Sequence, residues 1–488
     1  MSKMIEKARR YEREESQKIT RDKRPIYHFS NPIGWMNDPN GFSDYKGEHH
    51  LFFQYYPYAT HWDSMHWGHA KSNDFIRWEY LPIALAPDQC YDNFGVFSGS
   101  AIEDGENQIL IYTGVERKVT EKGENRIRQN QCIAIGNGIN YEKVENNPVV
   151  TADMLPIGSS QEDFRDPKIW KQDDKFFMVV GSRHSDGSGQ IALFCSEKLE
   201  KWEFIGILDR SENKIGTMWE CPDFYPLDGK QILMISPQEM EAKGLEFHNG
   251  NNTVFLIGNY DKEKFKFTRE KVQSIDYGLD FYAPQTMETD DGRRIMIGWM
   301  QSWDNPMYPD NQLYSGMMTI PRELSIKEER VCQLPVRELE KYRKNVIKHD
   351  RICIQEETEC KGICGRSIDL QLTLKGNEYD KFKMKLAADD KYYSEIIYDK
   401  DEKTLTFDRT HSGLKKDTLC TRSMFVSEKE DMLYLRILID SFSVEIFVND
   451  GEQVMSSLIY TPISASKISF QSNGKTYVDI TKYDIEVK

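Results

Sequence analysis

The chain is short of positive charge and has no long apolar run, and both shortages exclude broad classes of function. Its 488 residues contain 64 Lys and Arg against 79 Asp and Glu, a formal net charge of −15. An acidic surface repels the phosphates of nucleic acid and of anionic membranes. No apolar stretch approaches the ~20 residues that a membrane-spanning helix needs. We therefore expect neither nucleic acid nor a membrane as a partner.

Cysteine and metal-ligand patterns are also sparse. The nine cysteines are an odd number and lie scattered, without the spacing of a disulfide framework. Cys360 and Cys364 are close together, but no second pair or His cluster completes a zinc site. We predict no metal and no cofactor, and a reduced, cytoplasmic protein is the simplest interpretation.

The N-terminus lacks the ~7–15-residue apolar stretch of a secretory signal. A secreted protein whose signal has been removed remains the alternative for its location. Residues 1–24 are polar and charged, with Met4, Ile5, Ala8 and Tyr11 on one helical face, and we expect a helical N-terminal extension there.

The remaining composition is that of a folded protein with more than one domain. The chain is 39% hydrophobic and 29% charged, which does not indicate disorder, and it is longer than one hydrophobic core usually supports. Aromatic residues make up 12% of the chain, a content that suits both β-strands and stacking against sugars.

A pattern recurs five times: an aromatic start rich in turn residues, a polar turn and a short apolar strand. The starts are spaced by about 55 to 67 residues. Four strands can be placed in at least four of the units, which predicts an all-β fold with a five-bladed β-propeller over residues 25–335. The five starts lie at residues 35–41, 97–100, 164–167, 219–222 and 281–284.

The character of the sequence changes after residue 335. Residues 336–349 are heavily charged with helical spacing, and we expect a linker helix there. About eight short alternating strands follow, separated by turns such as 449–451, so residues 350–488 are predicted to form a C-terminal β-sandwich.

Three of the repeat starts contain an acid. Asp38, Asp166 and Glu220 each open the first strand of a predicted blade, the strand nearest the axis. Taken singly, 37–41 has the composition of an ordinary turn. Taken together, equivalent points of a radial repeat meet around one axis, so the three carboxyl groups are expected in one pocket. Converging carboxyl groups are the equipment for cleaving a glycosidic bond.

These motifs resemble those of glycoside hydrolase family 32. The similarity rests on 35–41, 53–57, 65–69, 97–100, 164–167, 219–222 and 280–283, and 438–447 is similar to the family's C-terminal sandwich. The resemblance implies that Asp38 is the nucleophile, Glu220 the general acid and then base, and Asp166 the transition-state stabiliser. We expect Arg165 to favour ionised Asp166, and burial beside Trp219 to keep Glu220 protonated.

The resemblance also implies sugar-binding positions. Hydrogen bonds to fructose are expected from one set of polar side chains, apolar walls from a set of aromatic ones, and a contact from Tyr282. The polar set is Asn37, Gln54, Ser98 and Arg165, and the aromatic set is Trp35, Trp62, Phe97 and Trp303. Gln301 stands where the family commonly has Gly, which puts the preference for the leaving group in doubt.

The predicted activity is that of a retaining β-fructofuranosidase acting on sucrose or short fructo-oligosaccharides. Three alternatives remain open: a sucrose-6-phosphate hydrolase, a fructan exohydrolase or transfructosylase, and a sugar-binding propeller without activity. A phosphate needs a cationic or helix-N-terminal site; Arg126, Arg128 and Arg183 are the candidates whose position the sequence leaves open. The sequence does not indicate an oligomeric state.

Overall fold

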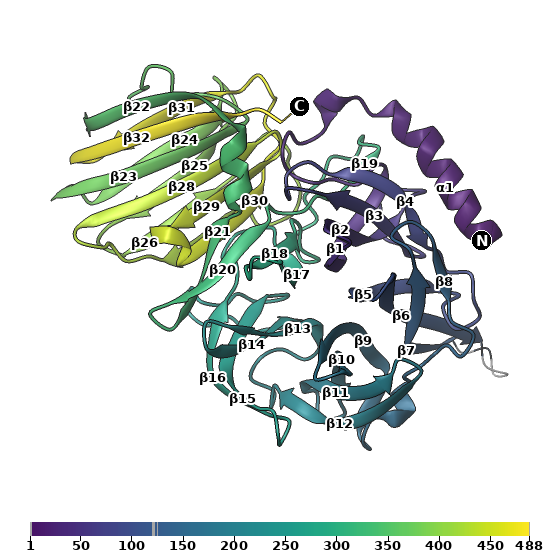
Figure 1. The fold of residues 1–488 in the computed structure, drawn as a ribbon. Coiled ribbons are helices and arrows are strands. Elements are labelled where there is room, and N and C mark those ends of the chain that lie inside the picture. The colour runs from purple at the N-terminus through teal and green to yellow at the C-terminus, as the bar shows by residue number, and fades with distance from the viewer. Residues whose placement is uncertain (1, 120–122, 124, 488) are drawn as a thin grey trace.

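The computed structural model describes residues 2–119, 123 and 125–487, and almost all of its regular structure is β-strand. Five sheets are arranged around a central opening, and two further sheets lie face to face beside them (Figure 1). The α-helix α1 (Lys3–Glu15) runs along the rim of the ring, with Ser2 as its N-cap and Ile5 and Ala8 buried. Short 3₁₀ turns are η1 (Ser16–Lys18), η2 (Arg21–Lys23), η3 (Ala152–Met154), η4 (Arg337–Tyr342) and η5 (Asn449–Gly451).

Each sheet of the ring begins with an inner strand and proceeds outward by antiparallel hairpins. The first sheet is β1 (Gly34–Tyr45), β2 (Glu48–Tyr56), β3 (His66–Ser72) and β4 (Glu79–Leu85), with β19 (Tyr314–Ser315) parallel to β1. The second is β5 (Gly95–Asp104), β6 (Asn107–Val119), β7 (Asn125–Gly136) and β8 (Tyr141–Lys143). The third is β9 (Ser159–Gln172), β10 (Lys175–His184), β11 (Gly189–Lys198) and β12 (Lys201–Arg210).

The remaining two sheets of the ring follow the same plan. The fourth is β13 (Trp219–Leu227), β14 (Lys230–Pro237), β15 (Val254–Asp261) and β16 (Lys266–Ser274). The fifth is β17 (Tyr282–Glu288), β18 (Arg294–Trp299), β20 (Arg322–Lys327) and β21 (Arg330–Pro335). The inner strands β1, β5, β9, β13 and β17 contact one another in that order, and β17 contacts β1 again. The expected propeller is confirmed; five sheets agree with five blades, a count that stays a prediction.

Hydrogen bonds between the inner strands hold the centre of the ring together. The Asn40 amide oxygen on β1 accepts a hydrogen bond from the backbone N–H of Gly99 on β5 at 3.1 Å. The Ser100 hydroxyl donates to the Pro167 carbonyl at 2.8 Å and accepts from the Ile169 N–H at 3.0 Å, which joins β5 to β9.

The same linkage continues to the last sheet and back to the first. Lys168 Nζ on β9 lies 3.1 Å from Asp223 Oδ2 on β13, and this oxygen accepts from the Thr286 N–H on β17 at 2.7 Å. The Gln285 side chain accepts from the Phe42 N–H on β1 at 2.8 Å, which completes the circle. We call the side chains of Asn40, Ser100, Lys168, Asp223 and Gln285 the axial belt.

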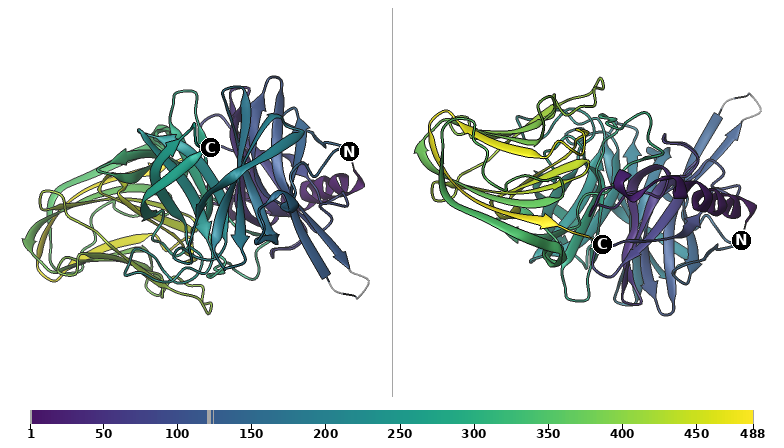
Figure 2. Two further views of the ribbon diagram at one scale, coloured as in Figure 1. Left: turned by 90° about the horizontal axis from the view of Figure 1, so that it is seen from below. Right: turned by 90° about the horizontal axis from the view of Figure 1, so that it is seen from above.

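The two packed sheets form the C-terminal β-sandwich, as expected. One sheet has the order β22 (Arg343–Ile354), β32 (Lys475–Ile485), β23 (Ile368–Glu378), β28 (Met432–Asp440), β29 (Ser443–Val448) and β30 (Gln453–Leu458). The other has the order β27 (Thr421–Phe425), β26 (Thr404–Asp408), β25 (Ser394–Asp399), β24 (Lys381–Ala388) and β31 (Lys467–Ser472). Further views show the sandwich standing at one side of the ring (Figure 2).

The expected linker helix over residues 336–349 is wrong in length and in part of its conformation. Only η4 is helical, and the chain from Arg343 onward is strand β22, which pairs with β32. The strand's ladder with β32 outweighs the weak helical preference of an exposed charged segment. The other domain boundaries stay a prediction.

A buried polar network joins the ring to the sandwich. His28 lies between Asp440 and Glu445, with its ring nitrogens 2.9 Å and 2.8 Å from their carboxylate oxygens. Arg322 pairs with Glu445 at 2.5 Å and with Asp276 at 3.0 Å, and all five side chains are buried. Because each charge has a partner, the interface is buried without an isolated ion.

Candidate active site

The inner strands carry a β-bulge at equivalent places, and the three acids lie at three of these bulges. The pairing of β1 with β2 shifts between Met36 and Pro39, and that of β13 with β14 shifts between Glu220 and Asp223. The ladder of β9 with β10 is shifted likewise at Asp166, whose φ is 67°. A bulge re-aims side chains and tolerates a strand proline, which explains the acid–proline pattern of the sequence.

Asp38 lies at the end of a short chain of hydrogen bonds. The Trp35 indole N–H donates to Asn37 Oδ1 at 2.8 Å, and the Asn37 amide donates to Asp38 Oδ1 at 3.0 Å. The Ser98 hydroxyl, from β5, donates to Asp38 Oδ2 at 2.6 Å. Burial raises the pKa of Asp38, these hydrogen bonds oppose the rise, and the charge of Glu220 adds to it.

Asp166 faces Asp38 across the thiol of Cys221. Cys221 Sγ lies 3.6 Å from Asp38 Oδ2 and 3.6 Å from Asp166 Oδ2, and the Cys221 N–H donates to the same Asp166 oxygen at 3.0 Å. Burial, together with the charges of Glu220 and Asp38, raises the pKa of Asp166 to about 7 against the lowering effect of the Arg165 cation. Burial and the neighbouring carboxylates raise the pKa of the Cys221 thiol as well, so it stays protonated.

Glu220 is held from both sides. Arg165 Nε donates to Glu220 Oε1 at 2.9 Å, and the Tyr282 hydroxyl donates to Glu220 Oε2 at 2.7 Å. The Tyr282 hydroxyl also lies 3.1 Å from the Ser236 carbonyl. Burial alone would lower the pKa of Arg165, but Glu220, Asp166 and Asp163 raise it, so the guanidinium stays charged.

Arg165 acts on Asp166 in the expected direction, because its cation lowers the pKa of that carboxyl. Its guanidinium pairs directly with Glu220 and with Asp163, and its effect on Asp166 is a through-space one that lowers the pKa without offsetting burial.

Aromatic side chains surround the acids. Trp303 is 40% exposed and stacks on Trp35 with ring centres 6.0 Å apart. The Trp62 ring packs edge-on against the Phe97 ring, with ring centres 5.6 Å apart. Phe97 directly precedes Ser98 in the chain. Trp35 and Tyr282 are buried in one cluster, with Trp62 and Phe97 packed against it, so these predicted walls lie together.

Two predicted positions have a different environment. Gln54 is buried and donates to the Val96 carbonyl at 3.0 Å, so it supports the segment that carries Phe97 and Ser98. Gln301 is buried too, in a gap of about 10 Å³ that Phe442 of the sandwich also lines. Its expected influence on the leaving-group side is therefore not seen; the side chain faces the domain interface.

Two polar residues of the site went unrecognised in the sequence. Thr113 Oγ1 on β6 accepts from the Asp166 N–H at 2.9 Å and donates to the Ser98 carbonyl at 3.1 Å. Gln129 on β7 accepts from the Phe164 N–H and from Arg165 Nη1, at 3.1 Å and 3.2 Å. Both stand in ordinary strand sequence, and only the β6–β7 hairpin geometry brings them to the acids.

Comparison with known proteins assigns the family. The model described as "Glycosyl hydrolases family 32 N-terminal domain" matches residues 28–335, and "Glycosyl hydrolases family 32 C terminal" matches residues 338–487. The chain belongs to glycoside hydrolase family 32. Together these two matches extend over most of the chain, so it is a glycoside hydrolase.

Family 32 relatives are similar over nearly the full length. The chain is 37% identical to a sucrose-6-phosphate hydrolase of Escherichia coli, over 92% of each chain. It is 36% identical to a raffinose invertase of Escherichia coli, over 91% of each. A solved β-fructofuranosidase of Bombyx mori matches with a TM-score of 0.86 and 33% identity, over 99% of this chain and 98% of that one.

Two further observations on the structure concern metal sites and membrane-spanning helices. Within residues 2–119, 123 and 125–487, no group of three or more His, Cys, Asp or Glu side chains could hold a metal ion. In the same part of the chain, no helix has the length and apolar character to cross a membrane.

Proposed function

We propose that the chain is a retaining β-fructofuranosidase, which hydrolyses the terminal non-reducing β-D-fructofuranoside of sucrose and short fructo-oligosaccharides. The observation that carries the proposal is the meeting of Asp38, Asp166 and Glu220, from three sheets, around Cys221 and Arg165. A retaining glycosidase needs two carboxyl groups on opposite sides of the scissile bond, one as nucleophile and one as acid. Family relatives named as invertase and β-fructofuranosidase support the substrate class.

In this proposal Asp38 attacks the anomeric carbon of fructose and Glu220 protonates the leaving oxygen. The bond to that oxygen breaks as an ester forms between fructose and Asp38. Glu220, now ionised, then takes a proton from a water molecule, whose oxygen attacks the same carbon and releases Asp38. Hydrogen bonds from Asn37 and Ser98 orient the Asp38 carboxylate and favour its ionised form.

The Tyr282 hydroxyl accommodates both protonation states of Glu220. It lies within hydrogen-bond distance of Glu220 Oε2 and of the Ser236 carbonyl, but it has only one proton to donate. When Glu220 is ionised, the hydroxyl donates to Glu220. When Glu220 is protonated, the hydroxyl donates to Ser236 and leaves Oε2 free to carry the catalytic proton.

Asp166 and the surrounding side chains complete the proposed sugar site. Asp166 stabilises the positive charge that develops on fructose, through the sugar hydroxyls. Hydrogen bonds to fructose are assigned to Asn37, Gln54, Ser98 and Arg165, and apolar contacts to Trp35, Trp62, Phe97 and Trp303. Because Gln54 already donates to Val96, its contribution to fructose is through its remaining amide groups.

A second candidate substrate is sucrose 6-phosphate, which the names of several relatives favour. Arg128 on β7 lies 3.5 Å from Asp153, and Arg126 is an exposed neighbour on the same strand. Arg128 is next to Gln129, which accepts a hydrogen bond from Arg165, so we assign a phosphate on the leaving sugar to this part of β7. A comparison of kcat/KM for sucrose, sucrose 6-phosphate and 1-kestose decides between the substrates, and a strong preference for the phosphate contradicts our ranking.

The direct test of the assigned acids is substitution. Asp38→Ala and Glu220→Ala are each expected to lower kcat on sucrose by at least a factor of about 10³, while the thermal unfolding midpoint stays near that of the wild type. Near wild-type turnover in either variant contradicts the assignment. Product analysis at high sucrose measures transfer to a second sugar in place of water. The cytoplasmic location stays a prediction.

A further inference from the structure

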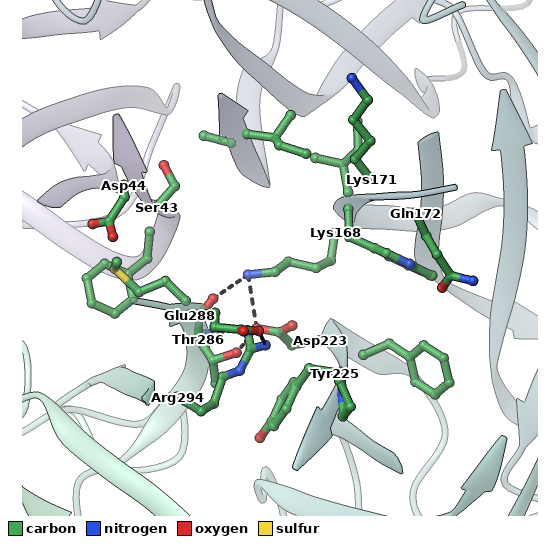
Figure 3. Close-up of a pocket in the computed structure, with 18 of the residues that line it drawn as sticks. Ser43, Asp44, Lys168, Lys171, Gln172, Asp223, Tyr225, Thr286, Glu288 and Arg294 are labelled. Carbon is green, nitrogen blue, oxygen red and sulfur yellow. Dashed lines mark hydrogen bonds and ion pairs between the residues drawn. The ribbon is translucent and has the colours of Figure 1, made fainter. Parts of the chain in front are cut away.

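A large cavity lies away from the acids, on the other side of the axial belt. Its volume is about 560 Å³, and it is lined by the inner-strand segments that follow the bulges, such as Phe42, Lys168, Asp223 and Thr286. Figure 3 shows Lys168 reaching across this space toward Thr286 and Asp223. The belt side chains therefore separate this cavity from the catalytic pocket along the axis.

Three polar atoms at this cavity have no hydrogen-bond partner among the described residues. They are the Asp223 Oδ1 oxygen, the Tyr225 hydroxyl and Arg294 Nε. Asp223 and Tyr225 are only 1% and 2% exposed, and a buried polar group without a hydrogen-bond partner is unfavourable. Together they offer a carboxylate acceptor, a hydroxyl that donates or accepts, and an N–H donor.

The charges of the lining cancel. Four cationic and four acidic side chains line the cavity, and the main pairs are internal: Lys168 with Asp223, and Arg294 Nη2 with Glu288 at 2.6 Å. A strongly anionic ligand would meet the free Asp223 oxygen, and a cation would meet Lys168 and Arg294. The remaining unpaired donor and acceptor groups suit a neutral molecule with many hydroxyl groups.

The walls and the size fit the same kind of molecule. Trp170, Phe42, Phe224 and Tyr225 contribute apolar atoms to the lining, which suit the C–H groups of a sugar. The volume lies within the range of about 300–1,000 Å³ of small-molecule sites. Exposed Lys171 and Glu288 stand among the lining, so the cavity opens to solvent.

We propose that this cavity is a second, non-catalytic binding site for a neutral hexose or disaccharide, which hydrogen-bonds Asp223 Oδ1, the Tyr225 hydroxyl and Arg294 Nε. The site lies on the strands that carry the acids: Asp223 is three residues from Glu220 on β13, and Lys168 is two residues from Asp166 on β9. Sugar bound there would be in contact with the belt that positions both acids.

The experiment uses the full wild-type chain with ¹³C-methyl-labelled methionine, because Met287 lines the cavity and reports on it locally. Its resonance is assigned from the spectrum of Met287→Leu. Titration with glucose or fructose, neither of which the enzyme consumes, is expected to shift the Met287 signal in a saturable way, and inorganic phosphate is expected to leave it in place.

Tyr225→Phe distinguishes direct binding from an effect relayed from the catalytic pocket. We expect this variant to raise the apparent Kd reported by Met287 by about threefold to tenfold, with kcat and KM for sucrose unchanged. The matched control is Tyr379→Phe, since Tyr379 is another buried tyrosine whose hydroxyl has no described partner, in the sandwich. No Met287 shift with sugars, a shift with phosphate instead, or a sugar shift that Tyr225→Phe leaves unchanged overturns the proposal.

Discussion

The protonation states of the acids in the site depend on electrostatic interactions among a few neighbouring side chains. Asp38, Asp166 and Glu220 are mutually close enough to raise the pKa values of the two aspartates. Among the residues that the structure describes, Arg165 is the one cation that pairs with a member of this group, through Glu220. The ionised carboxylates of the site, which burial disfavours, are therefore stabilised largely by one guanidinium and by the N–H and O–H donors around them.

Removing the Arg165 cation is expected to move the acidic limb of the pH profile. The pKa of Asp166 is raised to about 7, chiefly by burial, and this value already includes the lowering effect of the Arg165 cation. In Arg165→Gln the pKa rises further, so ionised Asp166 is lost at a higher pH and the acidic limb of kcat/KM shifts toward alkaline pH. Arg165→Lys keeps the charge and should shift the limb less. A limb that stays in place, or moves to lower pH, contradicts this electrostatic account.

The inner strand of each sheet, with its bulge and its belt residue, is the element that builds the active site from the sequence repeat. Each bulge aims a side chain toward the pocket, and the belt residues just beyond fix one inner strand to the next. Because the belt uses side chains to satisfy backbone groups of another sheet, its loss leaves buried N–H or C=O groups unpaired.

Gln285→Ala tests the belt at its closing link. The variant removes the acceptor of the Phe42 N–H and the donor to the Gly99 carbonyl. Two unpaired buried groups should lower the free energy of unfolding by about 2–4 kcal/mol, measured by urea unfolding. Gln285→Glu keeps the acceptor alone and should lose less, and the surface control Gln172→Ala should change little. A loss in Gln285→Ala no larger than in Gln172→Ala contradicts the belt's role.

The sequence predicted the inner strands and the meeting of the three acids because both follow from local patterns; the catalytic roles of the acids stay a prediction. Aromatic, acid and proline lie within a few residues of each other, and the repeat supplies their common position. The belt could not be predicted, because the link of Asn40 to Gly99 or of Lys168 to Asp223 depends on how sheets meet. Strand β22 was mistaken for helix since its partner β32 is more than a hundred residues away.

At the scale of the whole molecule, a buried ion network fixes the sandwich against the ring. His28 precedes the first strand, yet both of its partners, Asp440 and Glu445, belong to the sandwich. Asp280, two residues before the fifth inner strand, pairs with Arg409 of the sandwich. The sandwich thereby holds the segment that leads into Tyr282.

His28 predicts a specific pH dependence of stability. Burial alone would lower the pKa of His28, but the hydrogen bonds and charges of Asp440 and Glu445 raise it to about 9. The unfolded value is about 6.5, so the stabilisation is complete below pH ~6.5 and is lost as the pH rises through about 9, with a size on the order of 3 kcal/mol.

Thermal unfolding between pH 6 and 9.5 measures this effect. The wild-type midpoint should fall over the upper part of this range, whereas His28→Gln should be less stable at pH 6 and lack that fall. Equal slopes in the two proteins contradict the assignment of a charged His28.

The most direct test of the account is to trap the sugar on the nucleophile. In Glu220→Ala, a substrate whose leaving group needs no proton, such as β-fructosyl fluoride, still forms the ester, but its hydrolysis lacks the general base. Peptide mass spectrometry after acid quench is predicted to find the peptide of Asp38 heavier by one dehydrated hexose, with the label on Asp38. A label on Asp166 or elsewhere, or release of fructose with inverted configuration, would contradict the account.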